Sequence, residues 1–98
     1  MTLNKNSDGT ALTIRIIGRL DTGTSPQLEA EITSSIGGVS KLTLDFAELE
    51  YISSAGLRVL LKAQKAMMKQ GEMVIINASE TIREVFELTG FIDILTIA

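Results

Sequence analysis

Three short apolar segments, each followed by a polar loop and a stretch with helical spacing, limit this chain to an α/β fold. The apolar segments span residues 11–20, 41–46 and 73–76. Crossover helices make successive strands of a sheet parallel, so the three segments are expected to end at one edge. Ligands and partners of open α/β sheets usually bind at that edge. The loops expected there are residues 21–25, 45–54 and 77–79.

The two ends of the chain add further elements. Asp8-Gly9 is a favoured pair for the centre of a two-residue hairpin turn, which predicts a hairpin between strands Thr2–Lys5 and Ala11–Leu20. The apolar tail Phe91–Ile97 is expected to form a last short strand or a docked segment. At 98 residues, the chain has the length of a single domain.

Capping residues bound the three helices. The candidates for the N-caps are Ser25, Ser53 or Ser54, and Asn77 or Ser79. Pro26 suits the first helical position, and Gly71 is expected to stop the second helix in a left-handed conformation. The core face of the second helix is predicted to comprise Leu57, Leu60, Leu61, Met67 and Met68.

Missing residue types exclude several classes of function. The chain has no Cys and no His, which removes thiol catalysis, thiolate metal sites and serine–histidine triads. Four aromatic residues are too few for a base-stacking platform, and the net charge of −3 disfavours nucleic acid as a partner. No apolar run approaches the roughly 18 residues of a membrane span. We expect a soluble, cytoplasmic protein that is not an enzyme, has no cofactor or metal and does not insert into a membrane.

The start of the second helix holds the most informative residues. A helix N-terminus offers unpaired N–H groups and partial positive charge, which favour a phosphate or carboxylate. Ser53 and Ser54 place hydroxyls there, and the small Ala55 and Gly56 let another molecule approach the backbone. The alternative is that one serine is only the N-cap and that Gly56 allows tight packing against the sheet.

The same helix carries a basic stripe, comprising Arg58, Lys62, Lys65 and Lys69. Such a stripe is often only a solvated face, but charge of one sign in an acidic chain also suits an acidic partner. Arg58 is one turn after Ser54, close enough to pair with a phosphate on that residue.

Two acidic residues, Asp21 and Asp45, lie at the C-terminal ends of predicted strands. Asp21 and Thr24 lie after the long strand, either as turn-forming residues or as part of a site beside Ser54. Asp45 raises the separate hypothesis of a metal-assisted phosphoacceptor, which a single acid pair supports weakly.

The motif Tyr51-Ile52-Ser53-Ser54-Ala55-Gly56-Leu57-Arg58-Val59-Leu60-Leu61 resembles the signature of STAS domains, specifically the bacterial anti-sigma factor antagonists. Gly18-Arg19-Leu20-Asp21-Thr22-Gly23-Thr24 is similar to a second, weaker motif of that family. The resemblance implies one STAS-type α/β domain over residues 1–98. Its sheet would be mixed, with an N-terminal β-hairpin and with helices mainly on one face.

The resemblance also implies a partner-switching regulator of transcription. The unphosphorylated antagonist would bind a serine-kinase anti-sigma factor and release the sigma factor. ATP-dependent phosphorylation by that kinase would end binding, and a serine phosphatase would restore it. The implied acceptor is Ser54, with Ser53 as a minor alternative where many members carry Asp. The residues expected to bind the partner are Asp21, Thr22, Thr24, Ser53, Ser54, Ala55, Gly56, Arg58 and Lys62.

A second hypothesis is that the domain is a constitutive scaffold subunit of a membrane transporter or sensory complex. Ser54 would then be only the cap of the helix, and the basic stripe from Arg58 to Lys69 would make the contact.

Overall fold

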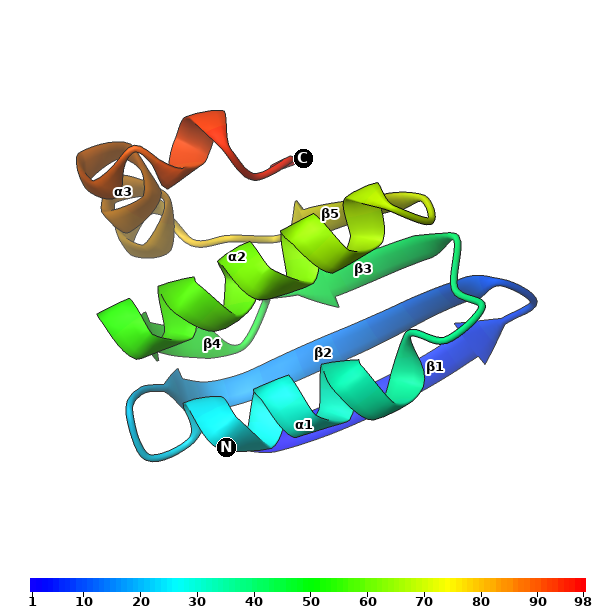
Figure 1. Cartoon of the computed structure of the whole chain (residues 1–98). Coiled ribbons are helices and arrows are strands. Elements are labelled where there is room, and N and C mark those ends of the chain that lie inside the picture. Colours follow the sequence, from blue (N-terminus) through cyan, green and yellow to red (C-terminus); the bar gives the residue numbers. More distant parts are fainter.

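The long strand β2 (Ala11–Leu20) organises the sheet because three other strands pair with it. A computed structural model describes all of residues 1–98 (Figure 1). Strand β1 (Thr2–Asp8) is antiparallel to β2, whereas β3 (Lys41–Asp45) and β4 (Leu49–Ile52) are parallel to it. Strand β5 (Glu72–Ile76) pairs in parallel with β3, giving the order β1-β2-β3-β5 with β4 beside the far end of β2. The predicted mixed sheet with an N-terminal hairpin is confirmed.

The hairpin turn lies one residue later than its predicted position. Asp8 pairs with Ala11, so the two central residues are Gly9 and Thr10, and β1 extends to Asp8 rather than ending at Lys5. Gly9 has a φ of 60° and Thr10 has no positive φ. This is the arrangement of a tight turn with glycine at its first central position, which matches the twist of the hairpin.

Strand β4 was not predicted from the sequence. Its ends, Leu49 and Ile52, are buried, but the two residues between them are exposed, so the alternation typical of a strand is absent. The strand forms because β2 continues five residues beyond its last pair with β3, at Arg15, and β4 pairs with that extension. The register shifts between Gly18 and Arg19, where Gly18 has a φ of 102°.

Helices α1 (Ser25–Ser35) and α2 (Ser54–Met68) lie side by side over one face of the sheet (Figure 1). Helix α3 (Glu80–Thr89) packs at one end, next to β4. The expected placement of helices mainly on one face is therefore confirmed. The fully buried core side chains include Ile14, Leu28, Leu44, Leu60, Ile75 and Phe86.

The ends of the first two helices differ in detail from the prediction. Thr24, not Ser25, occupies the N-cap of α1, and Ser25 is its first residue. Gly71 does not adopt a positive φ. Glycine is required there for another reason, because a Cβ would overlap the carbonyl oxygen of Ser40. The prediction of a left-handed stop at Gly71 was wrong.

The buried face of α2 is rotated relative to the predicted one. Leu57, Leu60 and Met67 are buried as expected, but Leu61 is only half-buried and Met68 is 71% exposed. The helix buries Val59 and Ala63 instead, because one side of it packs against α1 while another packs against the sheet.

The C-terminal part agrees with the sequence. Ser79 is the N-cap of α3, and its side chain accepts a hydrogen bond from the Ile82 N–H. Gly90 ends the helix with a φ of 80°. The tail forms a 3₁₀ turn (Phe91–Asp93) and then a parallel bridge between Ile97 and Ile75. None of the helices has both the length and the apolar character needed to cross a membrane.

Candidate functional site

Ser53 forms the structural start of α2. Its backbone is extended, with φ −99° and ψ 175°, and its Oγ accepts a 3.4 Å hydrogen bond from the Gly56 N–H. Its own N–H donates to the carbonyl of Leu20, at 2.9 Å. The residue is half-buried, and both its backbone and its hydroxyl are engaged in holding the end of β2 to the helix.

Ser54, the next residue, is not the cap that the scaffold interpretation expected, because Ser53 occupies that position. It is the first residue of α2, it is exposed, and its hydroxyl makes no hydrogen bond within the chain. The first turn of α2 contains no acidic residue. An exposed hydroxyl therefore lies at the positive end of a helix dipole that no carboxylate in the first turn compensates.

Gly56 faces the sheet. A Cβ at this position would lie 2.8 Å from Leu20 Cγ and 2.9 Å from Ile52 Cγ1, both closer than real side chains approach. The residue is buried, so its surroundings support tight packing, the alternative that the sequence left open. Its contact with a partner stays a prediction.

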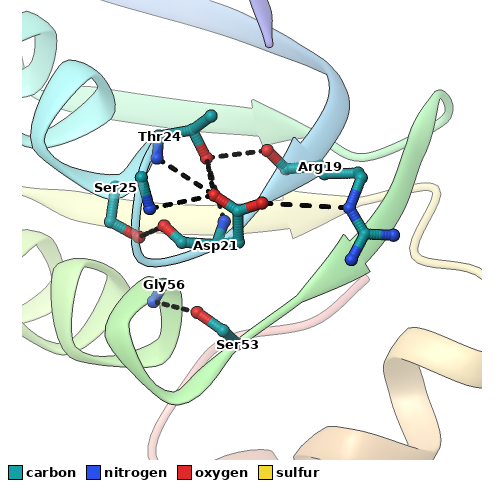
Figure 2. Close-up of polar contacts among 7 residues, drawn as sticks. Arg19, Asp21, Thr24, Ser25, Ser53 and Gly56 are labelled. Atoms are coloured by element: carbon teal, nitrogen blue, oxygen red, sulfur yellow. Dashed lines mark hydrogen bonds and ion pairs between the residues drawn. The ribbon is translucent and has the colours of Figure 1, made fainter.

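The loop after β2 is held by Asp21 and Thr24, as Figure 2 shows. Asp21 Oδ1 accepts hydrogen bonds from the N–H groups of Gly23 and Thr24, at 3.0 and 3.1 Å. The Thr24 hydroxyl donates to the Arg19 carbonyl at 2.8 Å and accepts from the Asp21 N–H at 2.9 Å. Ser25 Oγ donates to the Asp21 carbonyl. The turn-forming role that the sequence suggested for these residues is therefore present.

The same bonds determine the charge of the loop. The N–H of Thr24 contributes most to holding the pKa of the Asp21 carboxyl below its ordinary value, and the Thr24 hydroxyl, the Gly23 N–H and Arg19 act in the same direction. Asp21 thus remains an anion in the loop that leads into α1, where a partner would meet it as a fixed negative charge.

Arg19 and Tyr51 form a pair that the sequence did not predict. The two residues are opposite each other in β2 and β4, and the guanidinium lies 4.2 Å from the centre of the ring. Arg19 Nε also lies 3.8 Å from Asp21 Oδ2. Nothing in the sequence could indicate this stacking, because it depends on the unpredicted pairing of β4 with β2.

A groove between α1 and α2 gathers several of the predicted site residues. A hollow of about 210 Å³ at its N-terminal end is lined by Thr22, Ser25, Pro26, Glu29, Ala55, Arg58, Val59 and Lys62. Lys62 Nζ lies 2.7 Å from Glu29 Oε1, which joins the two helices across the groove. Arg58 is exposed and has no acidic partner. The structure therefore brings Thr22, Ala55, Arg58 and Lys62 together beside Ser54.

Asp45 belongs to a separate polar group. Its Oδ1 accepts hydrogen bonds from Asn77 Nδ2 and the Ala47 N–H, at 3.0 and 2.9 Å, and its Oδ2 lies 3.5 Å from Arg15 Nε. Desolvation raises the pKa of Asp45, but these hydrogen bonds and Arg15 outweigh it and hold the pKa below its ordinary value.

The separation of this group corrects the prediction of a single functional edge. Strand β3 ends opposite Arg15, five residues before β2 ends, so Asp45 and Asn77 lie roughly 16 Å along the strand from Leu20. The oxygens of Asp45 already have partners, and nowhere do three His, Cys, Asp or Glu side chains gather as metal ligands would. The arrangement gives no support to the metal-assisted phosphoacceptor hypothesis.

Comparison with known families identifies the domain. The profile of the STAS domain matches residues 2–98. The chain belongs to the STAS domain family. The sequence is 41% identical to BtrV of Bordetella bronchiseptica, named as a candidate anti-sigma factor antagonist, over 83% of this chain and 72% of that protein. It is 31% identical to the anti-sigma-B factor antagonist of Listeria monocytogenes, over 95% of this chain and 83% of the relative.

Solved structures agree with this assignment. An anti-sigma factor antagonist from Mycobacterium paratuberculosis superposes with a TM-score of 0.88 at 21% identity, over 98% of this chain and 83% of that one. SpoIIAA in its unphosphorylated form gives a TM-score of 0.78 at 23% identity, over 99% and 87% of the two chains. At these identities the likeness shows that the STAS domain shares their fold.

The relatives place this STAS domain in the anti-sigma factor antagonist family, whose members are non-enzymatic regulators. The resemblance predicted from the motifs around Asp21 and Ser54 is thus confirmed at the level of the family.

Proposed function

We propose that this STAS domain is an antagonist controlled by phosphorylation of Ser54. In the unphosphorylated form it binds a serine-kinase anti-sigma factor in the cytoplasm and releases the sigma factor. The kinase then transfers the terminal phosphoryl group of ATP to the Ser54 oxygen, the hydroxyl proton is lost, ADP leaves, and the complex dissociates. A serine phosphatase reverses the modification. The observation that carries this proposal is the exposed, unbonded hydroxyl of Ser54 at the start of α2.

The contrast between the two serines supports Ser54 as the acceptor. The hydroxyl of Ser53 caps the helix, and the residue is half-buried. Moving Ser53 into a kinase active site would break that hydrogen bond and loosen the first turn. Ser54 can be modified without the loss of any hydrogen bond in the chain, which leaves Ser53 as the minor alternative.

The fold is suited to accept the added charge. A phosphate at the first position of α2 would meet the positive end of the helix dipole, which favours an anion by about 0.3–1 kcal/mol. Arg58 is one turn further on, and side chains on a helix point back toward its N-terminus. Because Arg58 has no acidic partner, it is free to pair with the phosphate.

The switch therefore acts on the interface and not on the fold. A phosphate carries almost two negative charges, and burying it against a partner without a new cation costs several kcal/mol. Each 1.4 kcal/mol weakens binding tenfold, so a loss of at least about a hundredfold is expected. Two similar structures are of SpoIIAA in its unphosphorylated and phosphorylated forms, which supports a STAS fold that tolerates this modification.

The partner surface extends from Ser54 to the neighbouring loop and groove. It comprises Asp21, Thr22 and Thr24 in the loop, Ser53, Ala55 and Gly56 at the helix start, and Arg58 and Lys62 along α2. The fixed anion of Asp21 and the free cation of Arg58 give this surface opposite charges on its two sides. Such a pattern orients a docking protein as well as attracting it.

The test is to incubate the domain with the purified anti-sigma factor kinase of the same organism and ATP, and to map the product by mass spectrometry. We expect one phosphate, on Ser54, and none in Ser54→Ala. In binding measurements Ser54→Ala should retain the affinity of the unmodified domain, and Ser54→Asp should lose most of it. Ser53→Ala is the matched control, since it removes a neighbouring hydroxyl and should still be phosphorylated. Equal affinity of Ser54→Ala and Ser54→Asp would contradict the proposal and favour a constitutive scaffold.

A further inference from the structure

The groove between α1 and α2 consists of two hollows of different character. The first, described above, contains the cations Arg58 and Lys62. The second, of about 70 Å³, continues along the helices and is mostly apolar. Its lining residues are Glu29, Ile32, Thr33, Ile36, Val59, Lys62, Ala63 and Ala66. Glu29, Val59 and Lys62 line both hollows, so the Lys62–Glu29 ion pair lies where the two meet.

This ion pair is easily exchanged. The side chains of Lys62 and Glu29 are 72% and 42% exposed, and ion pairs in such surroundings contribute little to stability. It therefore does not serve mainly to hold the helices together. Its effect is to occupy Lys62 with an acid of the chain itself.

The charge along the groove is unbalanced. Glu29 is the only acidic residue that lines either hollow, and Lys62 already uses it. Arg58, Lys65 and Lys69 on the same helix have no acidic partner. A surface with excess positive charge beside an apolar hollow fits a partner that supplies an acid and an apolar side chain together.

We propose that this groove is the docking site for a segment of the anti-sigma factor that carries an acidic side chain next to an apolar one. The acid pairs with Lys62 and Arg58 and displaces Glu29, and the apolar side chain enters the second hollow against Ile32 and Val59. This rests on the proposed function only in that the partner is an anti-sigma factor. It does not depend on phosphorylation.

Glu29 then acts as a built-in competitor for the partner's acid. Glu29→Gln removes the competing charge and leaves Lys62 free, so it should raise the affinity of the domain for its partner about threefold to tenfold. Lys62→Gln removes the cation itself and should lower the affinity about tenfold. In the double variant most of the gain from Glu29→Gln should disappear, because no Lys62 is left to release.

The experiment is calorimetric titration of the unphosphorylated domain and its variants with the purified anti-sigma factor, at low and at high salt. Glu31→Gln is the matched control for Glu29→Gln, because Glu31 is on the same helix but pairs with Lys5 and lines neither hollow. Lys41→Gln is the control for Lys62→Gln, because Lys41 pairs with Glu72 on the sheet and lines neither hollow. Both controls should leave the affinity within about twofold, and the effect of Glu29→Gln should shrink at high salt.

The apolar hollow is tested by filling it. Ala66→Phe places a ring where the partner's apolar side chain would enter, and it should weaken binding about tenfold. Thermal unfolding of each variant verifies that it is folded, since Ala66 is only half-buried. As a second measurement, partner binding should shift the amide NMR signals of Val59 and Ala63 in the ¹⁵N-labelled domain.

The outcomes separate the two proposals. If the domain binds the anti-sigma factor but Glu29→Gln leaves the affinity unchanged or lowers it, the groove proposal is overturned while the role of Ser54 stands. Unshifted Val59 and Ala63 signals in a formed complex would overturn it as well. If the unmodified domain does not bind an anti-sigma factor at all, the proposed function fails, and the groove proposal fails with it.

Discussion

Helices α2 and α3 begin in the same way, yet only one of them is open to a new charge. Both have a serine in the N-cap with an extended backbone, and both caps accept a hydrogen bond from the N–H three residues later. The next position differs, because α2 has the neutral Ser54 where α3 has Glu80.

This difference teaches how a helix start can serve either as structure or as a switch. The Glu80 carboxylate already compensates the dipole of α3. The first turn of α2 contains no acid and is followed by Arg58. A phosphate on Ser54 would therefore supply the negative charge that compensates the dipole of α2, as Glu80 does in α3. A dianion can be added there and removed again while the capping serine beside it keeps the helix in place.

The two helix starts also differ on the side that faces the core, where α3 has a large side chain and α2 has none. The third helical residue is Gly56 in α2 and Ile82 in α3. Ile82 is 1% exposed and fills the core, whereas Gly56 lies so close to Leu20 and Ile52 that no side chain fits. The start of α2 is therefore tight toward the sheet and open toward solvent, which lets it display Ser54 in a fixed position.

The largest effect is expected from filling the tight side of α2. Gly56→Val forces a branched side chain against Leu20 and Ile52, and it should lower the free energy of unfolding by about 3 kcal/mol. Denaturant titration measures this loss. The neighbouring Ala55→Val, which points into the groove, should cost less than about 1 kcal/mol, and an equal loss in both would contradict the account of Gly56.

A smaller loss of stability is expected at Asp45, which joins the segment before α3 to the sheet through its hydrogen bond with Asn77. Asp45→Asn replaces the carboxylate that Asn77 and Arg15 contact, and it should cost about 2 kcal/mol at neutral pH. The pKa of Asp45 is lower in the folded than in the unfolded chain, so its contribution to stability is fully present above the ordinary aspartate pKa of 3.8. It is lost as the pH falls through the folded pKa.

This contribution of Asp45 can be followed by measuring the free energy of unfolding as the pH is lowered. The difference between the parent chain and Asp45→Asn should be constant at neutral pH and should shrink only below a pH of about 4. Asp21→Asn is the companion variant, since the pKa of Asp21 is also lowered. A difference for Asp45→Asn that stays the same down to the lowest pH would contradict the assignment.

The capping serines of α2 and α3 should contribute similarly to the free energy of unfolding. Ser53→Ala and Ser79→Ala each remove one hydrogen-bond acceptor and should cost about 1 kcal/mol. The bond is shorter at Ser79, 3.2 Å against 3.4 Å at Ser53, so the loss should be slightly larger there. Thermal unfolding monitored by circular dichroism compares the two, and a negligible loss at both would show that the caps are not structural.

The smallest change in stability is expected from altering only the charge that interacts with the helix dipole. Ser54→Glu gives α2 the charge that α3 has, and it should raise the free energy of unfolding by about 0.5 kcal/mol at low salt. Glu80→Gln should lower it by a similar amount. Added salt should reduce both changes. A Ser54→Glu variant that is clearly less stable than the parent would break the comparison between the two helix starts.

The sequence was sufficient for the elements with a clear local signal. The hairpin, the three helices and strands β2, β3 and β5 follow from alternation, from Pro26 at the start of α1, from the capping serines of α2 and α3, and from Gly90. The family motif also singled out Ser54 and Asp21, whose roles toward a partner stay predictions. These predictions depend on residues that are neighbours in the chain, where spacing and turn chemistry act directly.

The features that the sequence missed depend on tertiary packing. Strand β4 has no alternation and exists because β2 is longer than β3. Gly71 is explained by Ser40, a residue about thirty positions away, and not by its own φ. The Lys62–Glu29 pair and the two hollows require the observed approach of α1 to α2, and nothing in either helix alone indicates it.

The most direct measurement of the central claim uses the domain with phosphoserine installed at position 54 during translation. Its free energy of unfolding and its affinity for the anti-sigma factor are measured in the same preparation, beside the unmodified domain. We predict that the free energy of unfolding changes by less than about 1 kcal/mol while the affinity falls at least about a hundredfold. An unchanged affinity, or a loss of stability large enough to unfold the domain, would contradict a switch located at the exposed start of α2.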